Sequence, residues 1–470
     1  MKKHIIKKSF VAVSMMLLTV VASAQSSSSG YFLEGFNQRY QLNPAFAPER
    51  PVFLAIPAIS NFQMEVNSTV GLANFLYEST SKPGMLTTFM SPDIDAKTFL
   101  DGMPDAAQFT VGLNMDLFAL GVGGKRGFTT FNIKMKNSER VSLPKELFRF
   151  MKASFASDNY LIEDINVNVK SYMEASLTHS HKIGDNLTVG LGLKFLEGVE
   201  YLDVTINEID VRLSEEEWLA KSNGTIKASV PGAQYKLDPE TDTFDGMEGF
   251  EFSMPGSHGF AVDLGAEYDF KGLVDGLKVS AAVTDLGFIG WDKMNTFATN
   301  NNEYVRFGGF NNYDVNGDNS DETMDQISDD FNDMVKLYQT GTTTEKERVA
   351  LESTWRLGAE YNLPFAKWIS VGELLTYRTG AYPYGGSRTS LTLSPCGWID
   401  LSGNYALTSY GSTMGLLLNF HPTGFNLFIA VDRLKAELNP QYIPLHDCGV
   451  NFSVGLNLAL GRKRDKIKDE

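Results

Sequence analysis

Apolar and polar residues alternate without error along residues 450–460, just before the charged C-terminal end. Successive side chains of a β-strand point to opposite faces, so this segment predicts a strand with one apolar face and one small or polar face. The apolar positions are Val450, Phe452, Val454, Leu456, Leu458 and Leu460. In a soluble sandwich such a face packs on a second sheet, whereas in an exported chain with many such strands it is expected to meet lipid.

The same alternation recurs in segments of about ten residues, the length that a tilted strand needs to cross a bilayer. The clearest segments are 109–119, 129–135, 187–195, 260–270, 414–420 and 425–431, and weaker candidates are 52–67, 166–182, 277–288, 303–310, 354–363, 368–378, 388–394 and 398–408. Asp263 and Glu267 fall on a polar face, which suits a wet lumen and not a dry sandwich core. We therefore predict an all-β fold, a closed antiparallel transmembrane β-barrel of about 14 strands within a range of roughly 12 to 16.

Some segments depart from the strand pattern. Short turns alternate with long polar segments, as expected for periplasmic turns and extracellular loops, and three segments predict short helices over a loop or the barrel mouth. The helix signals are Ser142 as an N-cap with Pro144 in the first turn, Ser214 with Glu217 as a capping box, and apolar residues at helical spacing over 324–338. Glu373 shares an apolar face with Val371 and Leu375, which predicts a bulge or a strand end there.

The first 24 residues are organised as a secretory signal peptide. A basic start precedes an apolar stretch over 10–21, and Ala22, Ser23 and Ala24 form a small-x-small cleavage site. The predicted domains are a signal peptide at 1–24, an N-terminal segment at 25–50 that precedes the first strand, an outer-membrane barrel at 51–461 and a charged periplasmic tail at 462–470. No second apolar run is long enough for a transmembrane helix.

The chain is strongly acidic. Its formal net charge is −16, and it becomes −20 after cleavage because the signal peptide carries four Lys and no acid. Nucleic-acid binding needs Lys and Arg for the phosphates, so we predict no nucleic-acid partner.

One acidic segment loosely resembles a calcium loop. Its candidate ligands are Asp314, Asn316, Asp318 and Asp325, since alternate oxygen ligands can converge on one hard cation. However, Asn319 occupies the position where the turn needs glycine, and Asp325 replaces the final bidentate Glu. These departures favour the alternative of a solvated acidic surface loop without a metal.

The remaining reactive residues give no catalytic signature. Cys396 and Cys448 can form one disulfide in an oxidising compartment or remain two thiols. His179 and His181 share a strand face and can bind a metal with a third ligand, although lumen-facing polar residues are the favoured alternative. The motifs HExxH, GxSxG and CxxC are absent from the sequence, so we predict a protein that is not an enzyme and holds no cofactor. A lipase-type set of Ser, His and acid assembled across strands stays open.

Three segments resemble a known group of membrane proteins. Residues 41–48 resemble the Asn-Pro-Ala-aromatic start of Bacteroidota outer-membrane barrels, and 143–148 and 285–291 resemble segments of one such family of unknown function. That family is similar to the long-chain fatty-acid transporter superfamily. The resemblance implies a FadL-like barrel of about fourteen strands in the outer membrane, with residues 25–49 as a hatch in the lumen. The chain departs from the pattern at its C-terminus, which runs on to Glu470 instead of ending on an aromatic residue.

The hatch is too aromatic for a free tail, because each aromatic side chain gains by burial, and we expect residues 31–48 inside the barrel. Its predicted lumen residues are Tyr31, Phe32, Phe36, Tyr40, Asn43, Pro44 and Phe46. Three functions remain open. The first is passage or binding of a small apolar solute through a plugged barrel, as the resemblance implies. The second is a scaffold for an envelope protein of a secretion or surface-attachment system. The third, ranked last, is a barrel enzyme acting on lipid.

Overall fold

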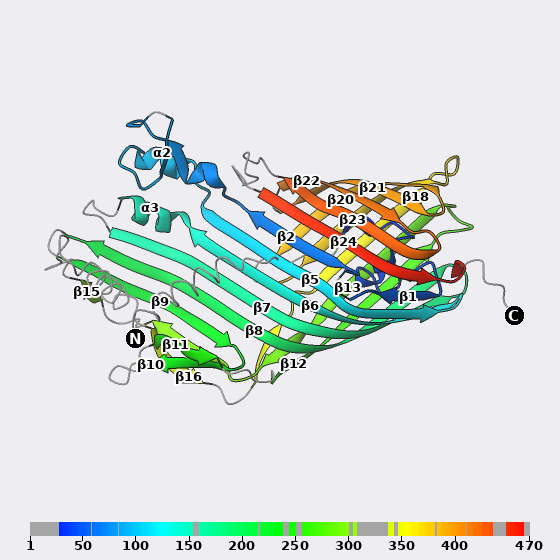
Figure 1. Ribbon diagram of the computed structural model, residues 1–470, viewed down its shortest axis with the longest axis horizontal. Helices are drawn as coiled ribbons and strands as arrows, with labels where there is room; N and C mark the ends of the chain where they lie inside the picture. The colour runs from blue at the N-terminus through cyan, green and yellow to red at the C-terminus, as the bar shows by residue number, and fades with distance from the viewer. Residues whose placement is uncertain are drawn as a thin grey trace.

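The strands of the computed structural model close into an antiparallel barrel of 14 strands (Figure 1). The first and last strands close the ring. β1 (Val52–Ala55) and β2 (Phe62–Ser68) are two halves of one strand, and both pair with β24 (Cys448–Leu460) on one side and with β5 (Ala106–Gly123) on the other. A closed barrel has no free sheet edge. The predicted all-β barrel and its strand number are confirmed.

The structure describes residues 28–464 except 58, 83, 154–158, 215–216, 238–243, 251–255, 300–303, 308–336, 343–345, 381–382, 410 and 436–447. The other barrel strands are β6 (Gly127–Pro144), β7 (Asn159–Ile183), β8 (Leu187–Leu213), β12 (Ser257–Asp269), β13 (Leu277–Trp291), β17 (Glu347–Ala350) continued by β18 (Thr354–Asn362), β19 (Ile369–Arg378), β20 (Tyr384–Cys396), β21 (Ile399–Thr408), β22 (Gly411–Phe420) and β23 (Gly424–Lys435). Outside the ring lie η3 (Leu72–Asn74), β3 (Leu76–Glu78), β4 (Leu86–Thr88), α2 (Ala96–Asp101), α3 (Lys145–Ala153), β9 (Trp218–Ser229), β10 (Ala233–Leu237), β11 (Phe244–Phe250), β14 (Asn295–Thr299), β15 (Val305–Phe307) and β16 (Leu337–Thr342).

The barrel is polar inside and apolar outside, the reverse of a soluble protein. Asn426 and Asn457 are completely buried in the lumen, whereas Phe260 and Met414 on the outer face are 61% and 67% exposed. An apolar outer surface around a polar interior is the pattern of a barrel that spans a membrane. Among the described residues, no helix combines the length and the apolar character needed to cross a bilayer.

The two ends of the barrel differ. Short turns such as 184–186 and 421–423 join strands at the end near the C-terminus, which we call the turn end. At the opposite end, the loop end, β7 and β8 run for 25 and 27 residues, far more than the roughly ten that cross a bilayer. These strands extend the wall on one side, and α2 and α3 lie at the same end of the barrel (Figure 1).

Two of the three helix predictions can be judged. α3 begins directly after Pro144, so a helix is present, but Ser142 belongs to β6 and does not cap it. The second prediction is wrong, because Ser214 and Glu217 form the turn between β8 and β9, where the Glu217 N–H donates to Ser214 Oγ at 3.0 Å. The β8 ladder continues into β9 and overrides the local helix signal. Most of the third segment, 324–338, lies outside the described residues, and its last two residues fall in β16.

The bulge predicted at Glu373 is also wrong. β19 pairs with β18 and β20 without a register shift, and Glu373 lies on the outer face in the middle of the strand. The hydroxyl groups of Ser387 and Thr389 on β20 donate to its carboxylate, the latter at 2.6 Å. Two neighbouring donors therefore allow a regular strand to carry an acid on a face that is otherwise apolar.

Replacing this acid with an apolar side chain is expected to stabilise the barrel. We predict that Glu373→Leu raises the free energy of unfolding by about 1 kcal/mol, because a charge on the lipid face is unfavourable. Urea unfolding in lipid vesicles measures the change. The matched control is Glu360→Leu on β18, since Glu360 faces the lumen and accepts from Ser370, and this change should destabilise. If both variants lose stability equally, the hydrogen bonds of Glu373 outweigh the lipid exposure.

Candidate functional site

The described part of the hatch, residues 28–50, lies inside the barrel at the turn end (Figure 1). It contains two short 3₁₀ turns, η1 (Ser28–Gly30) and η2 (Asn37–Gln41), and no strand. All seven residues named from the sequence are buried there: Tyr31, Phe32, Phe36, Tyr40, Asn43, Pro44 and Phe46. Burial in the apolar surroundings of this segment raises the pKa of the Tyr31 phenol above its ordinary value.

Glycines in the barrel wall make room for the hatch where the two approach most closely. Gly190 in β8 lies against the backbone of Pro44, and a Cβ atom at position 190 would overlap with it. Gly372 in β19 lies against the ring of Phe32 in the same way. A larger side chain at either position would push the hatch from the wall, so wall and hatch fit one another closely.

Side-chain contacts, and not a backbone ladder, join residues 28–48 to the wall. The contacts to three different strands are Ser29 N–H to Asp432 at 2.5 Å, Gln41 Nε2 to Asp116 at 3.0 Å and Arg356 Nη1 to the Leu42 carbonyl at 3.3 Å. Among the described residues, the backbone hydrogen bonds of this segment are local turns. The hatch can therefore shift without breaking the strand pairing of the barrel.

Ion pairs hold the hatch at the turn end. Glu34 pairs with Lys278, whose ammonium group holds the pKa of the Glu34 carboxyl at about 2. Glu49 pairs with Lys463 at 2.5 Å, and the Arg464 N–H donates to the Glu49 carbonyl at 2.8 Å. The first residues after the last strand thus pack against the hatch.

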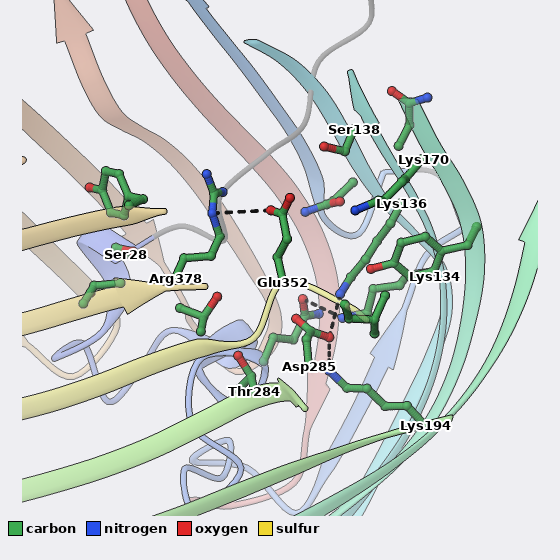
Figure 2. A pocket seen from close by; sticks show the side chains of 18 of the residues that line it. Ser28, Lys134, Lys136, Ser138, Lys170, Lys194, Thr284, Asp285, Glu352 and Arg378 are labelled. Carbon is green, nitrogen blue, oxygen red and sulfur yellow. Dashed lines mark hydrogen bonds and ion pairs between the residues drawn. The ribbon is translucent and has the colours of Figure 1, made fainter. Parts of the chain in front are cut away.

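A cavity of about 130 Å³ lies in the lumen between the hatch and the loop end (Figure 2). Ser28 and Gln41 of the hatch contribute to its lining, and charged side chains of the wall make up much of the rest. Seven of the lining residues are basic, namely Lys134, Lys136, Arg140, Lys170, Lys194, Arg356 and Arg378, and two are acidic, Asp285 and Glu352. The cavity is therefore polar and carries an excess of positive groups.

One part of this site, the balanced cluster, has equal numbers of acids and bases. It consists of Lys134, Lys136, Lys194, Glu174, Asp263 and Asp285. Lys136 lies 3.0 Å from both Glu174 and Asp285, and Lys194 lies 2.7 Å from Asp285 and 2.8 Å from Asp263. Each buried charge in this cluster has an opposite charge beside it, which offsets the loss of hydration.

A bulge in β13 brings Asp285 into the balanced cluster. The register between β12 and β13 passes from Val262 opposite Leu286 to Leu264 opposite Val283, so two residues oppose Asp263. Asp285 has a φ of 61°, which is uncommon for a residue other than glycine, and its N–H donates to Asp263 Oδ1 at 2.7 Å. The bulge aims its carboxylate at the lysines of β6 and β8.

The other part, the cationic cluster, has four bases and one acid: Arg140, Lys170, Arg356, Arg378 and Glu352. Arg140 binds Glu352 through both terminal nitrogens, with Nη2 at 2.7 Å from Oε2, and Arg378 Nε lies 3.5 Å from the same oxygen (Figure 2). Glu352 comes from the short break between β17 and β18. A single carboxylate therefore faces several cations.

The other candidate residues do not join this site. The calcium-loop candidates Asp314, Asn316, Asp318 and Asp325 lie outside the described residues. Within the part of the chain that is described, no group of three or more His, Cys, Asp or Glu side chains is arranged so that it could hold a metal ion.

The cysteine and histidine expectations are corrected by their positions. Cys396 ends β20 at the turn end and Cys448 begins β24 at the loop end, so the disulfide alternative is wrong and both side chains are thiols. His179 and His181 do not face the lumen. They are exposed on the outer face of β7, stacked 5.8 Å apart, and His179 Nδ1 lies 2.9 Å from the Thr129 hydroxyl.

Comparisons with known proteins give a family. The family model described as "Family of unknown function (DUF5723)" matches residues 44–432. No curated protein matches the chain. The solved toluene transporter TbuX of Ralstonia pickettii has a TM-score of 0.41 and 9% identity, over 92% of this chain and 100% of that one.

Two further solved structures have similar scores. The toluene transporter TodX of Pseudomonas putida has a TM-score of 0.40 and 9% identity, over 93% of this chain and 95% of that one. A FadL homologue of Pseudomonas aeruginosa has a TM-score of 0.40 and 13% identity, over 94% and 100%.

Proposed function

The chain belongs to a family of unknown function (DUF5723), and we propose that it is an outer-membrane barrel that binds a small solute in its lumen and passes it when the hatch moves. The observation that carries this proposal is a polar cavity on the loop-end side of a hatch that fills the turn end. A solute that enters from the loop end reaches the cavity first. It can leave at the turn end, on the periplasmic side, only after the hatch shifts.

The attachment of the hatch supports movement. Residues 28–48 are held by side-chain hydrogen bonds, by the Glu34–Lys278 ion pair and by packing on wall glycines, and no strand ladder ties them to the wall among the described residues. Each such hydrogen bond contributes about 1 kcal/mol, whereas opening the barrel wall would break a whole ladder. Hatch movement is therefore the easier route to an open path.

A disulfide between hatch and wall tests this movement. A Cβ atom at position 415 in β22 would lie 2.9 Å from Ser29 Oγ, close to the separation of a Cβ and the opposite sulfur across a disulfide. In a background with Cys396→Ser and Cys448→Ser, we expect Ser29→Cys with Gly415→Cys to block channel openings in potassium chloride when oxidised. Reduction should restore them.

The control for this lock is Gly415→Cys alone, which should behave the same under oxidising and reducing conditions. Planar-bilayer recordings before and after addition of a reductant give the opening frequency. Equal opening in the oxidised and reduced states of the double variant would contradict hatch movement.

An apolar solute remains the alternative, and a groove on the outer wall favours it. This groove has a volume of about 590 Å³ and lies over β12, β13, β18 and β19, with Leu264, Trp355, Leu357 and Tyr377 among its lining. Its apolar side chains face lipid, so a solute there would enter from the membrane. Retention of a brominated alkane that quenches Trp355 fluorescence would support this route, and no quenching beyond that in bulk lipid would argue against it.

The scaffold alternative has one favourable observation. Met85, Leu86 and Met90 in and beside the β3–β4 hairpin at the loop end are 57%, 68% and 50% exposed. Exposed apolar groups of this kind suit contact with another protein. The enzyme alternative has no comparable support. It needs a serine beside a histidine, whereas His179 contacts Thr129, His258 contacts Glu197, and His421 contacts Asp400 and Glu49.

A further inference from the structure

We propose that the cationic cluster of Arg140, Lys170, Arg356 and Arg378 binds the oxyanion group of the solute, a carboxylate or a phosphate. The inference rests on the proposed function for the route of the solute, and it adds the chemical class that the lumen accepts. The apolar outer face does not bear on it, because all four side chains line the lumen cavity, as Lys170 and Arg378 do in Figure 2.

The charge of the cavity differs in sign from the charge of the chain. Seven basic residues line the cavity, and the acids that line it or pair directly with its lysines are four: Glu174, Asp263, Asp285 and Glu352. The difference of seven minus four leaves three positive charges in excess, in a chain with a net charge of −16. An acidic protein that gathers cations at one internal site creates a local field that attracts anions and repels cations.

The excess belongs to the cationic cluster. In the balanced cluster, three lysines face three acids and need no further counter-ion. In the cationic cluster, Glu352 is the one carboxylate for Arg140, Lys170 and Arg378. The fourth base, Arg356, is acted on by Asp285 and Asp263 of the balanced cluster, which already pair with lysines. A buried cation without a counter-ion is costly, so this cluster is stabilised by any anion that fits between its members.

Two side chains offer unused donors to such an anion. Arg356 is 8% exposed, and its Nε has no hydrogen-bond partner among the described atoms. Lys170 lines the cavity, and no described carboxylate lies within ion-pair distance of its ammonium group. Guanidinium groups present paired N–H donors that match the two oxygens of a carboxylate or phosphate, so these donors suit an oxyanion better than a simple halide.

The size of the cavity limits what enters. The volume of about 130 Å³ is well above the roughly 10–15 Å³ that one ordered water molecule needs. This is enough for the oxyanion group and a short stem, while a larger body must extend toward the loop end. A neutral solute of the same size gains nothing from the cations and would leave their charge uncompensated.

Calorimetry on the purified full-length chain in an uncharged detergent tests the proposal. The probes are acetate and inorganic phosphate, and acetamide serves as the neutral isostere of acetate, all at one fixed ionic strength. We expect acetate and phosphate to bind and acetamide not to bind. Equal binding of acetate and acetamide, or no binding of either anion, would overturn the proposal.

Three variants locate the site. The Lys170→Gln, Arg378→Gln pair should weaken acetate binding by about tenfold or more, because it removes two cations from the cluster. Glu352→Gln should strengthen binding, since it removes the one competing carboxylate, and a damaged fold cannot imitate that gain. Lys271→Gln in an exposed turn should leave binding unchanged. Unchanged affinity in both cluster variants would place the anion elsewhere and overturn the proposal.

Failure of this inference is separable from failure of the proposed function. Binding is measured in detergent, without transport, and the disulfide lock on the hatch is read by potassium chloride conductance. A working lock with no anion binding would leave hatch movement standing and remove the solute class. Anion binding with no effect of the lock would keep the solute class and contradict hatch movement.

Discussion

Removal of residues 450–460 is expected to abolish insertion of the chain into membranes. These residues form most of β24, which pairs with β23 on one side and with β1 and β2 on the other. Without them, two strand edges would face lipid, where unpaired backbone groups have no water to bind and each costs several kilocalories per mole. Membrane fractionation and heat-modifiable migration in SDS gels measure the loss.

The matched control is removal of residues 465–470, which leaves the described part of the barrel intact and should insert normally. The two deletions differ in whether the ring can close. Recovery of the 450–460 deletion as a soluble, folded monomer would show that the apolar outer face does not require lipid, and it would contradict the membrane barrel.

The barrel could be predicted from the sequence because one local rule decides it. In β24, Asn451, Ser453 and Asn457 are buried, while Leu458 and Leu460 face outward, as strict alternation requires. The same rule separates lumen from lipid along most of the wall without knowledge of the neighbouring strands. The aromatic content of the hatch was a second local signal, and it predicted burial without giving the contacts.

The failures came from interactions between strands. Ser214 and Glu217 have the residues of a capping box, but the ladder from β8 into β9 decides their conformation. Glu373 violates the alternation, and the sequence of β19 gives no sign of the two hydroxyl donors on β20. A local pattern does not contain the register that brings such partners together.

The charged cavity could not be predicted from the sequence, again because its residues come from strands that are far apart in the chain. Alternation places Lys136 and Lys194 on lumen faces, but it does not place them beside Asp285, which follows 91 residues after Lys194. Arg140 and Glu352 are 212 residues apart and meet only because the barrel closes. A cluster of charges across a lumen depends on strand order, tilt and the bulge in β13 together.

Removal of hatch residues 25–48, with the signal peptide kept, is expected to leave a folded barrel with an open path. The ladders of the 14 strands do not involve these residues, and the wall around the hatch carries polar side chains such as Asn132 and Asn457, which water can hydrate. The large aromatic side chains that fill the turn end would be gone. Solutes too large for the intact protein should then pass.

Single-channel conductance in planar bilayers tests the central claim most directly, because it reports whether the hatch closes an otherwise open barrel. The account predicts a full-length protein that is closed except for brief openings, and a 25–48 deletion that conducts steadily at a higher level. Heat-modifiable migration of the deletion variant confirms that its barrel is folded. Equal conductance of the two folded proteins would contradict the account.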